Sequence, residues 1–314
     1  MNILITGGTG FIGQNLISFL HETKNHRLFG SSRNPHTIDS LISQKVESWT
    51  NHVDEVFLND HKIDAIVHLA GIAHDFEGNY GEQDYFRVNF EWTCQLFNEF
   101  LKSSSQTFIF LSSIKAAVEE SEEMVDESVD ARPITNYGKS KLKAEKYILE
   151  NTKSEKTSIV LRPCMVHGRG NKGNLNFLYR LVNKGIPYPL GKFHNERSFL
   201  SIDNLNFIIS EILDKRITTG IYHVADDIPV DTKDLIDLIC AEIKIKTRIW
   251  MIPKSIIHSL AHFGTLLRLP FNKSTLQKLT GNQVVPNKKI KKALGTELPV
   301  STHEGLIKTI RSFR

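Results

Sequence analysis

A glycine-rich turn directly after the first apolar run most limits what this chain can fold into. Residues 3–6 form that run, glycines follow at positions 7, 10 and 13, and an amphipathic stretch covers 11–23. In such a unit the first glycine permits the tight turn, the second lets backbone approach a pyrophosphate, and the third lets the helix pack on the strand. The helix N-terminus then faces the anion. A tight turn without a ligand is the alternative, but the motif predicts a dinucleotide site formed by Gly7, Gly10, Phe11, Ile12 and Gly13.

Short apolar runs alternate with amphipathic stretches through the first half of the chain. This alternation predicts an α/β fold, a Rossmann-type doubly wound parallel sheet with helices on both faces. The predicted strands cover 3–6, 27–30, 65–69, 107–111 and 158–162, with a weaker candidate at 46–49. The predicted helices cover 11–23, 84–104 and 135–152.

The pattern changes after Arg162-Pro163, where Gly and Asn residues become frequent. We expect residues 1–165 to form the Rossmann domain, with segments near 200–226 returning to it. Residues 166–314 are expected to form a smaller mixed α/β lobe at the C-terminus that binds substrate. Open α/β folds bind ligands at the carboxyl ends of their strands, so we expect the lobe to pack over that edge.

Composition excludes several classes of protein. With 314 residues, of which 40% are hydrophobic and 24% charged, the chain is typical of a globular protein. Its net charge of +4 is too small to indicate a nucleic-acid partner. Three cysteines without a Cys-x-x-Cys pair indicate neither a disulfide framework nor a metal site. Because Met1 runs straight into an apolar run, we expect no secretory signal and a cytoplasmic location.

The stretch Trp250–Pro270 is rich in Ile, Leu, His and Phe at helical spacing. Charged and histidine side chains and prolines interrupt it, so we expect no stable insertion into a membrane. Packing within the small lobe is the favoured interpretation, and contact with a membrane or a partner enzyme is the alternative.

The end of the second predicted strand bears on the choice of cofactor. An Asp or Glu there usually accepts a hydrogen bond from the ribose of NAD, but this chain has Ser31-Ser32-Arg33. Hydroxyls and a guanidinium can hold a 2′-phosphate, so Ser32 and Arg33 favour NADP(H) and leave NAD(H) as the alternative. A surface charge is the other interpretation of Arg33. After the strand 65–69, the small residues of Leu69-Ala70-Gly71 allow the cofactor to approach.

A tyrosine and a lysine four residues apart indicate proton-transfer chemistry. Tyr137 and Lys141 lie at the start of an expected helix, where side chains at this spacing project from one face. A phenol with a pKa of about 10 needs a nearby cation to act at neutral pH, and Lys141 can lower the pKa of Tyr137. Ser113, at the end of the strand 107–111, is the candidate third partner. Chance spacing and a serine that merely ends a strand are the alternatives.

Several motifs occur together and in order: the glycine turn, His68-Leu-Ala-Gly71, Val88-Asn89, Ser112-Ser113, Tyr137-x-x-x-Lys141 and Leu161-Arg162-Pro163. In this the chain resembles the extended short-chain dehydrogenase/reductases, in their NAD-dependent epimerase/dehydratase branch that acts on nucleotide sugars. The resemblance implies that Tyr137 and Lys141 also contact the cofactor. It further implies that Asn174 and Arg197 hold the diphosphate of a UDP-sugar, with Leu190 near the uracil. A helix cap for Asn174 and a salt bridge for Arg197 are the alternatives.

The residues after Ser113 bear on the reaction. Dehydratases of this family carry an Asp-Glu pair there, whereas this chain has Ile114-Lys115, so dehydration is not expected. The motif Ile72-Ala-His74 looks like that of enzymes which reduce UDP-4-keto-6-deoxy-N-acetylhexosamines for surface polysaccharide, and His74 is a candidate substrate contact. The resemblance therefore implies a 4-ketoreductase, with a UDP-hexose 4-epimerase as the alternative and a non-catalytic dinucleotide-binding protein as a third hypothesis. Pairing of two copies into a homodimer is also expected of such relatives.

Overall fold

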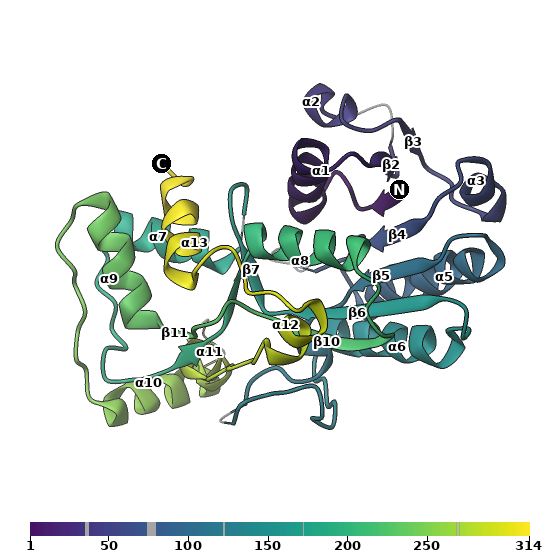
Figure 1. Cartoon of the computed structure of the whole chain (residues 1–314). Coiled ribbons are helices and arrows are strands. Elements are labelled where there is room, and N and C mark those ends of the chain that lie inside the picture. Colours follow the sequence, from purple (N-terminus) through teal and green to yellow (C-terminus); the bar gives the residue numbers. More distant parts are fainter. Residues whose placement is uncertain (35–37, 74–79, 122, 172, 268, 270) are drawn as a thin grey trace.

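The computed structural model describes residues 1–314 except 35–37, 74–79, 122, 172, 268 and 270 (Figure 1). Seven parallel strands form the central sheet in the order β10-β6-β5-β4-β1-β2-β3. Their bounds are β1 Asn2–Thr6, β2 Arg27–Ser31, β3 Ser48–Thr50, β4 Ala65–His68, β5 Thr107–Leu111, β6 Thr157–Pro163 and β10 Gly220–Val224. The predicted doubly wound parallel sheet is confirmed, and its weak strand candidate at 46–49 corresponds to β3.

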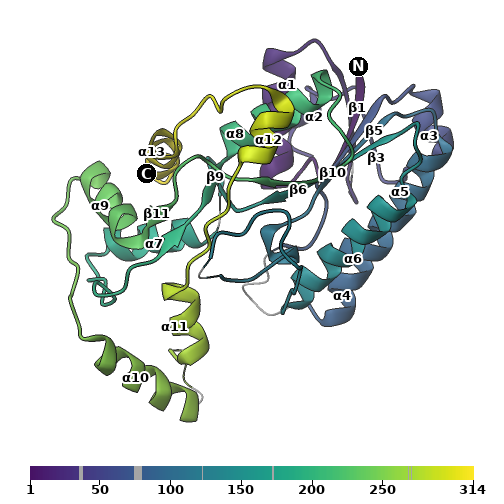
Figure 2. The ribbon, with the colours of Figure 1, turned by 60° about the horizontal axis from the view of Figure 1, so that its bottom comes forward.

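Alternate residues of each strand enter two separate cores, one on each face of the sheet. In β1, Ile3 and Ile5 belong to one core and Leu4 to the other. The first core is covered by α1 Phe11–Thr23, α8 Ile202–Asp214 and α12 Lys288–Leu294. The second is covered by α3 Glu55–Asp60, α5 Trp92–Lys102 and α6 Asn136–Asn151. Figure 2 shows these two helical layers on opposite sides of the sheet. Burial on both faces explains why the strands are continuous apolar runs.

The predicted helix over 84–104 is interrupted by a change in helical type. It consists of α4 Glu82–Phe86, a π-helical turn over Arg87–Glu91, and α5. A π-turn inserts one extra residue into a helix and is frequent at functional sites. Here the turn contains Asn89, which is fully buried.

The second half of the chain forms a smaller lobe and also returns to the sheet. Strand β10 pairs in parallel with β6, and α8 packs against α1. The lobe contains two short two-stranded sheets, β7–β9 and β8–β11, with helices around them (Figure 1). Its elements are β7 Met165–His167, α7 Asn174–Asn183, β8 Glu196–Arg197, β9 Phe199–Ser201, β11 Val230–Asp231, α9 Thr232–Ile243, α10 Lys254–Leu266, α11 Lys273–Thr280 and α13 Thr302–Arg311. The remaining short helix is α2 Ser40–Ser43.

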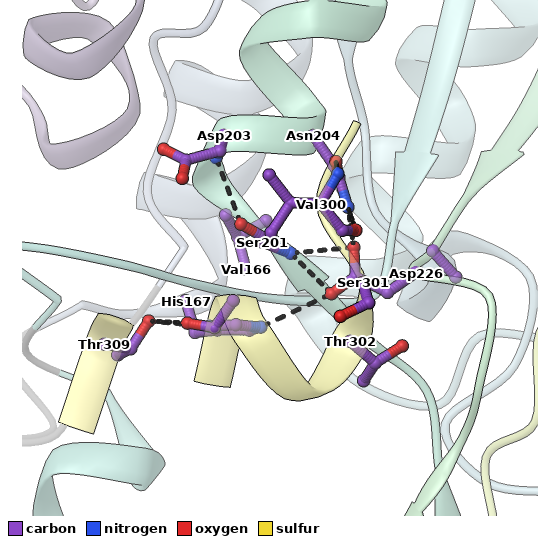
Figure 3. A network of polar contacts seen from close by, with 12 residues as sticks. Val166, His167, Ser201, Asp203, Asn204, Asp226, Val300, Ser301, Thr302 and Thr309 are labelled. Atoms are coloured by element: carbon purple, nitrogen blue, oxygen red, sulfur yellow. Dashed lines mark hydrogen bonds and ion pairs between the residues drawn. The ribbon is translucent and has the colours of Figure 1, made fainter. Parts of the chain in front are cut away.

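A buried polar network ties the lobe to the sheet (Figure 3). Asp226 follows β10, and its carboxylate accepts hydrogen bonds from the backbone of Ser201 at 3.0 Å and from Asn204 at 2.7 Å. The ring of His167 lies 3.6 Å from the same carboxylate and shares a 2.8 Å hydrogen bond with Thr309 of α13. The ring of His167 is therefore enclosed in this network.

Among the described residues, no helix is both long and apolar enough to cross a membrane. Nor do three or more His, Cys, Asp or Glu side chains gather there in an arrangement that could bind a metal ion.

Candidate active site

The glycine turn packs closely against the segment that follows β4. Gly7 has a φ of +71°, and a Cβ atom at this position would lie 2.7 Å from the backbone nitrogen of Ala70. A Cβ atom at Gly13 would lie 2.3 Å from the carbonyl oxygen of Gly7. Real Cβ contacts are not this short, so neither position accepts a side chain. These contacts account for two of the three glycines that the dinucleotide motif contains.

The N-terminus of α1 has the properties of an anion site. Gly10 is its N-cap and provides no side-chain oxygen, and the first turn contains no acidic residue. Phe11 and Ile12 begin the helix, so their backbone N–H groups lie at its positive end. A side-chain cap or a carboxylate would compete with a phosphate for these donors, and neither is present. The glycine turn and the start of α1 thus fit the pyrophosphate of a dinucleotide.

Asn89 holds the backbone just beyond Gly71. Its side-chain oxygen accepts from Ile72 N at 2.8 Å, and its amide donates to Ile72 O at 3.0 Å and to the hydroxyl of Ser140 at 3.2 Å. A Cβ atom at Gly71 would lie 2.8 Å from Asn89 Oδ1 and 3.1 Å from Lys141 Nζ. The π-turn therefore connects the Leu69-Ala70-Gly71 segment to the helix that carries Tyr137 and Lys141.

Ser113, Tyr137 and Lys141 converge at the carboxyl end of β5. Thr135 caps α6 by accepting from Gly138 N at 3.2 Å, which places Tyr137 in the first turn. A Cβ atom at Gly138 would lie 2.3 Å from the carbonyl oxygen of Lys115, so a glycine here lets α6 approach the turn after Ser113. The Ser113 side chain is hydrogen-bonded to the Tyr137 phenol. The structure thus brings together the three residues predicted to be catalytic.

The electrostatics of this cluster differ from the expectation in one respect. Burial raises the pKa of Tyr137 to about 12, and the hydrogen bond from Ser113 only partly opposes this. Burial also lowers the pKa of Lys141 to about 8, with Glu145 opposing. The Lys141 ammonium donates to the Leu111 carbonyl at 2.9 Å and lies 4.7 Å from the Phe110 ring centre. The pKa of Tyr137 is therefore raised and not lowered as expected, and the group that opposes the rise is Ser113 rather than Lys141.

Behind the cluster lies a buried ion pair that sequence reasoning missed. Glu145, on α6, accepts from Arg162 Nη2 at 2.6 Å and Nε at 3.0 Å, and from the hydroxyl of Ser112. Both charged side chains are almost fully buried. Tyr137, Lys141 and Glu145 follow one another at four-residue spacing, and this repeat was the signal available in the sequence.

His68 has a structural role. It is fully buried at the end of β4, and its two ring nitrogens share hydrogen bonds with Thr6 at 2.6 Å and Thr93 at 2.9 Å. Burial lowers its pKa to about 3, so it is neutral at physiological pH.

The acidic segment after Ser113 contacts the helix that carries Tyr137. Glu119 is half-buried and accepts from Thr135 at 2.5 Å. Glu120 lies against Gly281 of the small lobe. Val125 is buried and bonds to Val284, so this loop packs between the two halves of the molecule.

The four predicted substrate contacts have different surroundings. Asn174 is exposed at the first position of α7 and is not its cap, since Gly173 holds that position without a side-chain bond. Arg197 donates to Gly281 O at 3.1 Å; burial lowers its pKa, and Glu120 opposes this shift. Leu190 is only 2% exposed and its side chain packs in a core with α10, so a position near the uracil stays a prediction that the side chain itself does not support. His74 lies outside the described residues.

A cavity opens at the carboxyl ends of β2 and β3. It has a volume of about 730 Å³, and its lining includes Ser31, Asn51, Val53, Asp54, Trp92 and Gln95. Ser32 and Arg33 follow directly in the chain, and Arg33 is exposed. No acidic residue lies between Leu28 and Asn34, so the end of β2 has no carboxylate of its own to accept from a ribose.

Comparison with known proteins agrees with this geometry. The NAD dependent epimerase/dehydratase family matches residues 3–225, which include every element of the site described above except the segments beyond β10. The chain belongs to this family. The resemblance inferred from the motifs, to the epimerase/dehydratase branch of the extended short-chain dehydrogenase/reductases, is thereby confirmed.

Individual relatives match this chain over most of its length. A protein named UDP-glucose 4-epimerase from Vibrio cholerae is 31% identical over 99% of this chain and 95% of its own. A GDP-6-deoxy-D-talose 4-dehydrogenase from Aggregatibacter actinomycetemcomitans is 28% identical over 76% of this chain and 79% of its own. Among solved structures, the Bordetella bronchiseptica enzyme WbmG in complex with NAD has a TM-score of 0.77 at 17% identity, covering 100% of this chain and 94% of that one. This structural likeness concerns the fold.

Proposed function

We propose that the protein is an NAD(P)-dependent enzyme acting at C4 of a UDP-linked hexose. The observation that carries the proposal is the hydrogen-bonded pair of Ser113 and Tyr137 hydroxyls at the carboxyl end of β5, with the Lys141 ammonium bonded to the last residue of that strand and close to Gly71. Tyr137 can transfer a proton to or from a sugar hydroxyl or ketone placed there, and Ser113 can orient that oxygen.

The cofactor cradle consists of backbone from the glycine turn and from Leu69-Ala70-Gly71, with Lys141 beside the latter. When bound, NAD(P) supplies the acceptor or donor of hydride. The protein's part is to hold the pyrophosphate at the start of α1 and to keep Gly71 close to the Lys141 ammonium. The close contacts at Gly7, Gly13 and Gly71 support this assignment, because any side chain there would fill the cradle.

Tyr137 is the proposed proton carrier at the C4 oxygen. With a pKa of about 12 the phenol is protonated at neutral pH, so it suits the donation of a proton to a ketone oxygen. In the opposite direction it must accept the proton of the C4 hydroxyl, which requires the Lys141 ammonium to stabilise the phenolate. Ser113 holds the same oxygen by its hydroxyl. On the substrate side, Arg197 and Asn174 are the proposed diphosphate contacts.

A UDP-hexose 4-epimerase is the first candidate. The Vibrio cholerae relative with that printed name matches this chain from end to end, and the structure of a Thermotoga maritima UDP-glucose 4-epimerase with UDP-glucose has a TM-score of 0.77 at 20% identity. An epimerase oxidises C4 and returns the hydride to the other face, so it needs Tyr137 to move a proton in both directions.

A ketoreductase acting on a UDP-4-keto-6-deoxy-N-acetylhexosamine is the second candidate. The observation that favours it is the end of β2, where Ser32 and an exposed Arg33 stand instead of a carboxylate. These side chains suit the 2′-phosphate of an exchangeable NADPH. NADP(H) preference, a cytoplasmic location and a homodimer stay predictions from the sequence.

One set of assays separates these hypotheses. Inversion of UDP-glucose and UDP-galactose at C4, followed by NMR without net consumption of NAD, would support the epimerase. Loss of NADPH or NADH absorbance in proportion to the added 4-keto sugar would support the ketoreductase. Cofactor binding without turnover of either substrate would favour the non-catalytic hypothesis and overturn the proposal.

Replacement of Tyr137 by Phe tests the assigned proton carrier. We expect Tyr137→Phe to lower kcat by about 10²–10⁴, the usual contribution of a positioned acid or base, while dinucleotide affinity is retained. Fluorescence titration with NAD and NADP(H) is the control for binding. Full activity in this variant would show that another group carries the proton.

A further inference from the structure

The helix α10 exposes an apolar stripe that the small lobe does not cover. Ile256, Leu260, Phe263 and Leu267 recur at spacings of four, three and four residues and are 50%, 54%, 59% and 65% exposed. Residues at this spacing lie along one face of a helix. The stripe extends over about 16 Å at the helical rise per residue. Figures 1 and 2 show α10 at the outer edge of the lobe, away from the central sheet.

A second apolar stripe on the same helix holds it to the protein. Ile257 and Ala261 are buried with Leu190, Phe193 and Leu276. Gly264 is crossed so closely by the returning chain that a Cβ atom there would overlap the Phe271 carbonyl oxygen. The helix is therefore formed and anchored independently of whatever covers its outer stripe. The expectation that this stretch packs within the small lobe holds for the inner stripe only.

More apolar surface lies on the segments that flank α10. Trp250 and Met251, just before the helix, are 56% and 59% exposed. Leu266 and Leu269, at its far end, are 73% and 49% exposed. Exposed apolar side chains gathered along one helix and its flanking segments mark an interaction site rather than ordinary scatter. Tryptophan beside such a surface is typical of a side chain at a membrane–water interface.

The charge around the stripe has a single sign. From Ile243 to Thr280 the sequence contains seven Lys or Arg and no Asp or Glu. The whole chain has 35 acidic residues in 314, so a segment of this length would contain about four on average. Lys254 begins α10, and its ammonium lies 5.4 Å from the Phe193 ring centre. Lys192, in the loop packed beneath α10, and Lys273, on α11, are both exposed. An apolar stripe in a segment whose charged residues are all basic is complementary to an anionic lipid surface.

We infer that α10 and its flanking residues bind the surface of an anionic membrane, with the apolar stripe in the headgroup region and the lysines on lipid phosphates. A second copy of this chain is the less favourable occupant. Two copies joined through the same face would bring Lys254 and Lys273 of each against the other, and the segment provides no carboxylate to pair with them. The helix lies on the membrane and does not span it.

Vesicle sedimentation tests this with the full chain. We expect the protein to sediment with vesicles of phosphatidylcholine containing one-third phosphatidylglycerol, to bind pure phosphatidylcholine weakly, and to be released by high salt. Trp250 is the internal reporter: its fluorescence should shift to the blue on addition of the anionic vesicles, and this shift should be absent in Trp250→Phe. No sedimentation with the anionic vesicles, and no shift, would overturn the inference.

A matched pair of variants locates the surface. Phe263→Ser should reduce partitioning onto the anionic vesicles about tenfold, the effect of losing one large apolar side chain from the buried face. Phe177→Ser removes a phenylalanine that is 65% exposed on α7 of the same lobe and should leave partitioning unchanged. Equal partitioning of the two variants would overturn the assignment. So would analytical ultracentrifugation that shows a dimer abolished by Phe263→Ser, because a second copy would then cover the stripe.

Discussion

The buried pair of Glu145 and Arg162 gives the sharpest prediction about stability. Their side chains are 1% and 3% exposed, and Glu145 accepts from two guanidinium nitrogens and from the hydroxyl of Ser112. Removing one partner of a buried pair costs about 3–5 kcal/mol, because the other charge stays buried without compensation. Glu145→Gln keeps the volume and one acceptor oxygen, so we expect the lower end of this range, about 3 kcal/mol.

Thermal and urea unfolding followed by circular dichroism measure this cost. At about 2 °C per kcal/mol for a chain of this size, Glu145→Gln should lower Tm by about 6 °C. Glu150→Gln, an exposed position on the same helix, is the matched control and should change stability by less than about 0.5 kcal/mol. The double replacement Glu145→Leu with Arg162→Met should recover most of the loss, since it leaves no unpaired charge. A loss below about 1 kcal/mol in Glu145→Gln would refute this reasoning.

Three further predictions concern the site itself. Burial lowers the pKa of Lys141 to about 8, so kcat/KM should fall as the pH rises through about 8 and Lys141 loses its proton. In Lys141→Arg this basic limb of the kcat/KM profile should move to higher pH. An unchanged limb would assign it to another group. Gly13→Ala should reduce dinucleotide affinity at least about tenfold in fluorescence titration, since its Cβ would lie 2.3 Å from Gly7 O, whereas Gly81→Ala, with its nearest neighbour at 3.9 Å, should bind normally. Arg33→Ala should raise KM for NADPH about tenfold and leave KM for NADH unchanged, and equal effects on both would remove the argument for NADP(H).

Local sequence patterns were sufficient to predict the sheet and the three proposed catalytic residues. The strands are continuous apolar runs because both faces of a parallel sheet are buried, and the glycines at 7 and 13 are required by contacts within the first turn itself. Ser113 lies just after β5, and Tyr137 lies in the first turn of α6. The order of the elements along the chain fixes where both of these lie in an alternating α/β fold. Such features depend on neighbours in sequence, and sequence therefore predicts them.

Other features depend on contacts between distant segments, and these were missed. The pairing of Glu145 with Arg162 and the position of Glu119 beside Thr135 arise only when α6 packs on the sheet. On α10 two apolar stripes lie side by side, so periodicity indicated a helix without indicating which stripe is covered. Leu190 was expected near the uracil, but its side chain packs in the core against Ile257 and Ala261 of that helix.

Strand β10 also has a consequence for how the protein is made. It forms the edge of the sheet beside β6, yet β7, α7, β8, β9 and α8 separate the two in the chain. A nascent chain that has emerged only as far as β6 contains six of the seven strands of the sheet. One face of that sheet still lacks the apolar side chains that α8 contributes to its core. Thr309, the partner of His167, is synthesised later still, after β10 and the helices that follow it. The Rossmann half therefore cannot complete its fold during translation until much of the small lobe has been synthesised, and the two halves must mature together.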